Sequence, residues 1–150
     1  IKRSRMTALL GDNNNYKLKE IFKLIETNDK IFKYHLDRYK YASRFNYEDL
    51  GTHRDAGMKI LISLNKRLKV FATKEKPLFL VDAKESLADW ALWPFVRQFR
   101  IADSKKFDQS NELKFLSKWL THFLSHKKYS IVMEKYAPWS KQNDPIFFGK

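Results

Sequence analysis

The chain has 150 residues, of which 30 are lysine or arginine and 17 are acidic, and it contains no cysteine. This length suits one domain with its own core, and 43% hydrophobic residues exclude a disordered tail. The lack of cysteine excludes disulfides and thiolate metal sites, and no apolar run approaches the ~20 residues of a membrane span. We therefore expect a cytoplasmic protein that does not enter a membrane.

Residues 16–41 are predicted to form one long helix. The apolar residues of this segment fall within a stripe of about 100° when the chain is wound at 100° per residue. The stripe consists of Leu18, Ile21, Phe22, Ile25, Phe32, Leu36 and Tyr39. Because the pattern continues through Asn28 and Asp29, it favours one long helix over two short ones.

A second helix is expected from about Tyr47 to Leu68. Its apolar face would contain Leu50, Gly57, Leu61, Leu64 and Leu68. The small Gly57 on this face would let a neighbouring helix approach closely. Residues 71–85 then read as a connector, because Pro77 prevents the helix from continuing. Within this connector, the apolar residues 77–81 are expected to form a buried loop, because no partner strand is evident.

Residues 86–95 carry the strongest local signal. Ser86 is followed three residues later by Asp89 and then by an apolar run, which is the pattern of a helix capping box. The helix that follows has no polar face, so it belongs in the centre of a bundle. Pro94 should bend or loosen this helix, since it lacks a hydrogen-bond donor. Asp89 is expected to be a buried structural cap rather than a catalytic acid or base.

Residues 101–111 are predicted to be a second connector. Leucines and a phenylalanine at helical spacing then predict a helix of about four turns over residues 113–124. A further helix is expected from Tyr129 to Tyr136, followed by an irregular aromatic tail. Together these elements predict an all-α helical bundle with one apolar helix in its middle.

His122 and His126 lie four residues apart, which is a spacing at which two imidazoles on a helix can share one zinc ion. The segment lacks the glutamate of the metalloprotease motif. Both histidines are also predicted to lie opposite the leucine stripe, toward solvent. We therefore expect surface residues and no metal site.

The candidate binding residues lie on the first helix. Tyr34, Arg38 and Tyr41 cluster opposite its apolar stripe, with Arg44 close behind. Tyrosines that flank an arginine can stack on a planar ligand while the arginine pairs with an anion. Three interpretations stay open for this face: a ligand pocket, a packing surface for another domain or subunit, and a solvated face.

The formal net charge of +13 raises the possibility of a nucleic-acid partner. The basic excess is spread evenly, with 11 basic and 7 acidic residues in 1–50, 10 and 5 in 51–100, and 9 and 5 in 101–150. The densest basic runs, 1–5 and 65–69, are short. A solvated basic surface is the preferred interpretation, and any nucleic-acid binding should be weak and sequence-blind.

Residues 24–45, 86–99 and 116–139 resemble, in the same order, the C-terminal all-helical domain of glutathione S-transferases. In that family a Ser/Thr-x-x-Asp box caps a buried helix that carries a proline. The resemblance is greatest to a bacterial branch and spans residues 1–150. It implies that the family's thioredoxin-like domain, which holds glutathione and the catalytic residue, precedes Ile1. Since the chain begins with Ile rather than Met, we expect a fragment of a longer protein.

The resemblance implies a function for this half of the parent protein. It would supply the side of the cleft that binds a hydrophobic electrophile, and part of a homodimer interface, while glutathione is the co-substrate. The chain alone would not be catalytic and would hold no cofactor. Because fold does not fix function, the alternative is a non-catalytic adaptor module of the same fold.

Overall fold

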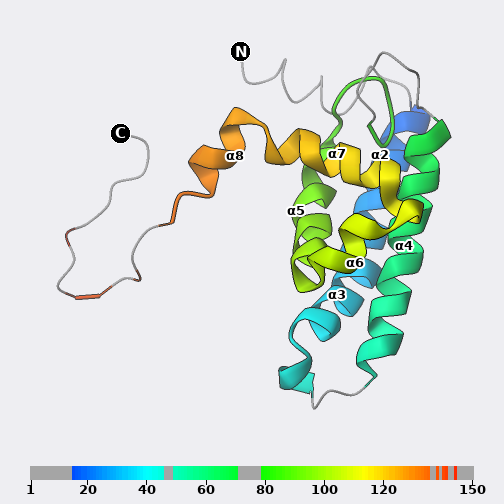
Figure 1. Cartoon of the computed structure of the whole chain (residues 1–150). Coiled ribbons are helices and arrows are strands. Elements are labelled where there is room, and N and C mark those ends of the chain that lie inside the picture. The colour runs from blue at the N-terminus through cyan, green and yellow to red at the C-terminus, as the bar shows by residue number, and fades with distance from the viewer. Residues whose placement is uncertain are drawn as a thin grey trace.

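The computed structural model describes residues 15–45, 49–70, 79–135, 138, 140, 141 and 144. Within them the chain is helical and forms no strand, which confirms the all-α prediction. Figure 1 shows the helices gathered into a bundle, with α8 leading away from it. In chain order they are α2 (Asn15–Thr27), η1 (Asn28–Phe32), α3 (Lys33–Lys40), η2 (Ala42–Phe45), α4 (Leu50–Val70), α5 (Leu87–Ala102), α6 (Ser104–Gln109), η3 (Asn111–Leu113), α7 (Lys114–Leu124) and α8 (Lys127–Val132).

The first predicted helix is continuous, but it contains a π-helical segment. The backbone stays right-handed helical at Thr27, Phe32 and Lys33, and η1 between α2 and α3 has π-helical hydrogen bonding. A π turn holds more residues than an α turn, so it shifts the apolar face relative to a uniform helix. The prediction was therefore wrong at Phe22, which is 53% exposed, while Asn28 is buried.

α4 begins at Leu50, directly after Asp49, which has a positive φ of 52°. The predicted start at Tyr47 lies outside the described residues. Leu50, predicted on the apolar face, is 40% exposed, because it is the first residue of α4. Figure 1 shows that α4 begins at one end of the bundle. Gly57 is buried and leaves room for a neighbouring element, but a side chain fills that room: a Cβ atom there would lie 2.4 Å from Cε2 of Phe99 on α5. The Phe99 ring, rather than the backbone of α5, occupies the space beside Gly57, so no larger side chain fits at this position.

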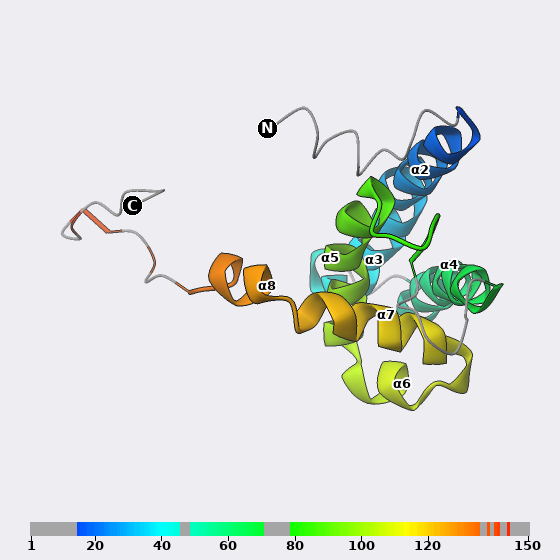
Figure 2. The same cartoon turned by 90° about the horizontal axis from the view of Figure 1, so that it is seen from above.

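α5 is the central helix of the bundle. It packs against α2 and α3 on one side and against α7 on the other (Figure 2). No residue from Ser86 to Arg100 is exposed, and the helix runs through Pro94 as one α-helix. Its buried side chains are Ala88, Asp89, Leu92, Trp93, Val96 and Phe99. The expectation of an apolar, buried central helix is confirmed.

The predicted connector after α5 contains a helix that the sequence analysis missed. Asp103 caps α6 by accepting a hydrogen bond of 3.1 Å from the backbone N–H of Lys106, and Phe107 packs into the core. α7 covers the predicted segment except for Leu113, which belongs to the adjoining η3. α8 begins two residues before Tyr129 and ends at Val132, and most of the aromatic tail lies outside the described residues.

Two polar side chains of α4 hold neighbouring segments in place. Oδ1 of Asn65 accepts hydrogen bonds from the backbone N–H groups of Phe115 (2.8 Å) and Leu116 (3.0 Å), so α4 caps the start of α7. Arg67 donates to the carbonyl of Leu80 and forms an ion pair with Glu20 at 2.8 Å. In the basic run 65–69, Arg67 is therefore held by neighbouring segments, whereas Lys66 and Lys69 are exposed.

The described part of the predicted buried loop, residues 79–81, is buried as expected. Phe79, Leu80 and Val81 lie in the core, whereas Pro77 falls outside the described residues. Across residues 15–45, 49–70 and 79–135, no helix combines the length and the apolar character needed to cross a membrane.

Candidate functional site

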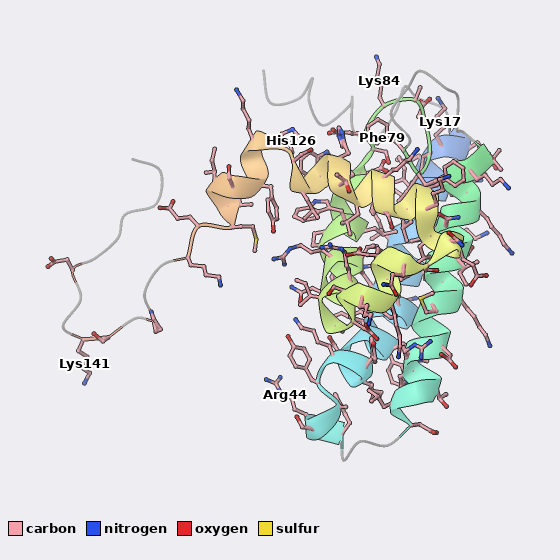
Figure 3. The ribbon with its side chains drawn as sticks, viewed as in Figure 1. Lys17, Arg44, Phe79, Lys84, His126 and Lys141 are labelled. Carbon is pink, nitrogen blue, oxygen red and sulfur yellow. The ribbon has the colours of Figure 1, made fainter. Side chains whose placement is uncertain are left out.

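The predicted binding residues gather at one end of the bundle, where α3, η2 and the start of α4 meet. We call this region the α3–α4 corner, and it consists of Tyr34, His35, Arg38, Tyr41, Arg44, Phe45 and His53. None of these side chains is buried, and Tyr34 is 46% exposed. Figure 3 shows Arg44 at the end of the bundle, remote from the loop that carries Phe79 and Lys84. The corner is therefore a surface feature and not part of the core.

Aromatic rings hold the two arginines of the corner. Cζ of Arg38 lies 3.6 Å from the ring centroid of Tyr34 and 4.6 Å from that of Phe45. Tyr34 and Arg38 meet because they are one helical turn apart. Cζ of Arg44 lies 4.5 Å from the ring of Tyr41. The structure thus joins the four predicted residues as two stacked pairs, Tyr34 with Arg38 and Tyr41 with Arg44.

A pair of histidines, which the sequence analysis missed, lies beside the first stacked pair. Nδ1 of His35 on α3 is 2.9 Å from Nδ1 of His53 on α4. Both imidazole rings make edge-to-face contacts with the ring of Tyr34. One ring must donate a proton and the other must accept it, so only one of the two Nδ1 atoms carries hydrogen. Burial lowers the pKa of His35, and the nearby charges of His53 and Arg38 lower it further. The lowered pKa favours the neutral form of His35, which can then share one hydrogen with His53.

This geometry predicts that the protein loses stability in mild acid. Because the pKa of His35 is lower in the folded state than its ordinary value of 6.5, the unfolded chain binds a proton first as the pH falls below about 6.5. The free energy of unfolding should begin to decrease near pH 6.5 and should go on decreasing until the pH falls below the pKa of His35 in the folded state. The measurement is urea denaturation at several pH values between 7.5 and 5. His35→Gln should show a shallower decrease than the wild type, and equal decreases would contradict the prediction.

His122 and His126 were predicted to face solvent, but both side chains contact neighbouring residues. Nε2 of His122 is 2.7 Å from Oε1 of Glu85, whose other oxygen accepts a hydrogen bond of 2.9 Å from Nε1 of Trp90. His126 packs its ring edge-on against Trp90, with 5.6 Å between the ring centroids. Both histidines are half-buried because the loop before α5 and Trp90 cover this end of α7. In the part of the chain that the structure describes, no three His, Cys, Asp or Glu side chains are placed to hold a metal ion.

Ser86 and Asp89 form the capping box at the start of α5. The Asp89 carboxylate is fully buried and accepts four hydrogen bonds of 2.6–2.8 Å. The donors are the backbone N–H groups of Leu80 and Ser86, the Ser86 hydroxyl and Nε1 of Trp119. A carboxylate has about four acceptor positions, so none remains for a substrate.

The environment of Asp89 also affects its ionisation. Burial raises the pKa of the Asp89 carboxyl, and the hydrogen bonds from Ser86, Leu80 and Trp119 act in the opposite direction. A perturbed carboxyl can mark a catalytic acid or base. Here the group is sealed inside the core and ties three segments together, so its arrangement is that of a structural cap.

Comparison with known proteins gives no match: no protein-family model fits the chain, and no curated protein or solved structure is significantly similar to it.

Proposed function

We propose that this chain is the helical half of a glutathione S-transferase-like protein of the cytoplasm. The observation that carries the proposal is the Ser86–Asp89 capping box at the start of the buried, proline-bearing helix α5. That combination is the feature by which residues 86–99 resemble the family. The order of helices before and after α5 is consistent with the same assignment.

In this proposal the outer face of α3 and its neighbours borders a cleft. Ile31, Tyr34 and Arg38 follow one another at spacings of three and four residues, so they share a helix face. Ile31 is 50% exposed and Tyr34 is 46% exposed. A surface that is apolar apart from Arg38 suits contact with a hydrophobic electrophile. The same surface also suits contact with a thioredoxin-like domain or a second subunit. Tyr34, Arg38, Tyr41 and Arg44 would contact the electrophile or the interface.

The chemistry itself would belong to the other domain. Glutathione conjugation forms a bond between the thiolate sulfur of glutathione and the electrophilic carbon, and the leaving group departs with its electron pair. This step needs a group that stabilises the thiolate. Asp89 is sealed in the core and already accepts four hydrogen bonds, so it cannot serve as this group. This half therefore contributes substrate binding and positioning.

The test compares the natural protein that contains this chain with the 150-residue chain alone. Both are assayed with glutathione and a chromogenic aromatic electrophile. We expect the natural protein to conjugate the electrophile and the isolated chain to remain at the background rate. Conjugation by the isolated chain would place the catalytic group within these residues and contradict the proposal.

The second candidate is a non-catalytic adaptor of the same fold. It is favoured by large apolar side chains exposed along α2, η1 and α3, namely Tyr16, Phe22, Ile31 and Tyr34. Such side chains are typical of a surface that binds another protein. Retention of the natural protein on immobilised glutathione would support the transferase, whereas passage through the column without any conjugating activity would support the adaptor.

A further inference from the structure

The arginines of the α3–α4 corner differ from the other described arginines because they have no side-chain hydrogen-bond or ion-pair partner among the described residues. Four of the six described arginines bind an acidic or hydroxyl side chain. These pairs are Arg54 with Asp55, Arg67 with Glu20, Arg97 with Tyr129 and Arg100 with Asp108. Arg38 and Arg44, within the described residues, instead rest on aromatic rings and have no acidic partner. The corner therefore holds two guanidinium groups that no carboxylate of the described residues neutralises.

Stacking prepares these two groups to bind an anion. A ring that covers the face of a guanidinium leaves its N–H groups in the plane, where they can donate to an oxyanion. Among the described residues, Arg38 makes one such contact, a long one of 3.5 Å to the carbonyl of Tyr34 in its own helix. The rings also limit the motion of the side chains, so less conformational entropy is lost when a ligand binds.

The surroundings favour negative charge in the ligand. Asp37, the acidic residue next to Arg38 in sequence, is paired with Lys33 at 2.5 Å. Lys40 lies 4.8 Å from the same Tyr41 ring that carries Arg44 and adds another cation. Tyr34 is about half exposed, so part of its ring can contact a planar ligand. An aromatic ring and an oxyanion in one small molecule would use both features of the corner.

We propose that Arg38 and Arg44, stacked on Tyr34, Phe45 and Tyr41, form a binding site for a small aromatic oxyanion, either a carboxylate or a phosphate monoester. The guanidinium groups donate to the oxyanion, and the exposed tyrosine surface contacts the aromatic ring. The site is made entirely by this chain. It therefore does not depend on a glutathione-binding domain or on any catalytic activity.

The test titrates the isolated 150-residue chain with three probes and follows the backbone amide resonances of α3 and η2 by NMR. Benzoate and phenyl phosphate represent the two kinds of oxyanion, and benzylamine is a cation of similar size. We expect at least one of the oxyanions to bind with shifts centred on α3 and η2, and benzylamine not to bind there. The oxyanion that binds with the higher affinity shows whether the corner prefers a carboxylate or a phosphate monoester.

Variants locate the site. Arg38→Gln and Arg44→Gln should each weaken the binding about 10-fold or more, because a hydrogen bond to a charged group contributes about 1.5–3 kcal/mol. Arg100→Gln is the matched control, since it removes an arginine that Asp108 already neutralises on α5 and α6, and it should leave the affinity unchanged. The amide spectrum of each variant reports whether it is folded. Failure of both oxyanions to bind at millimolar concentration, or equal losses in all three variants, would overturn the proposal.

Discussion

Replacing Asp89 with alanine should lower the free energy of unfolding by about 3–5 kcal/mol. The carboxylate is fully buried and accepts hydrogen bonds from the loop before α5, from the start of α5 and from α7. Alanine would leave the N–H groups of Leu80, Ser86 and Trp119 buried without an acceptor, and each such donor costs about 1–3 kcal/mol when nothing replaces the bond. Urea denaturation at pH 7 measures the loss.

Two milder changes at the same place serve as controls. Ser86→Ala removes a hydroxyl but leaves the other three donors to Asp89, so it should cost about 0.5–2 kcal/mol. Asp89→Asn keeps the shape and can still accept from Leu80 and Trp119, but its NH₂ group opposes the N–H of Ser86, so the loss should be intermediate. A loss below about 1 kcal/mol for Asp89→Ala would mean that these bonds do not hold the segments together.

Replacing Gly57 with alanine should destabilise the protein even though alanine is the better helix former. The new Cβ atom would meet Cε2 of Phe99 at 2.4 Å. The Phe99 ring is buried, stacks on Phe32 with 5.8 Å between centroids, and touches Tyr39 at 5.1 Å, so it has little room to move. Overpacking of this kind costs about 1–3 kcal/mol, which exceeds the gain of up to about 1 kcal/mol in helix propensity.

Gly51→Ala, on the same helix, is the matched control for Gly57→Ala. Nothing lies within 4 Å of a Cβ atom at Gly51, so only the change in propensity remains. We expect it to raise the free energy of unfolding by a few tenths of a kcal/mol, up to about 1. Thermal or urea unfolding of the two variants should therefore move in opposite directions. A shift of both variants in the same direction would show that the Phe99 ring is not packed against Gly57.

The features that could be predicted from the sequence are those that depend on neighbouring residues. The start of α5 follows from Ser86 and Asp89, because a capping box is made by residues three apart. The apolar run after it indicates a buried helix without reference to any other segment. α6 was missed although its cap, Asp103, is visible in the sequence, because the segment is short and contains a single core residue, Phe107.

The features that could not be predicted depend on packing between distant segments. The π-helical η1 shifts the face of α2, so a uniform helical period misplaces Phe22. Asn65 caps a helix that begins about 50 residues later. In the candidate site the pairing of Tyr34 with Arg38 follows from their spacing of four. His35 and His53 meet only because α3 packs against α4, which the spacing of apolar residues does not reveal.

Our central proposal is that this chain provides the side of a cleft that binds a hydrophobic electrophile in a glutathione-dependent transferase. The most direct test is the steady-state kinetics of the natural protein carrying Tyr34→Ala, with glutathione and a chromogenic aromatic electrophile each varied in turn. We expect the KM for the electrophile to rise about 10-fold, equivalent to the loss of about 1.4 kcal/mol of binding, while the KM for glutathione changes less than about twofold. An unchanged KM for the electrophile together with a raised KM for glutathione would contradict the claim.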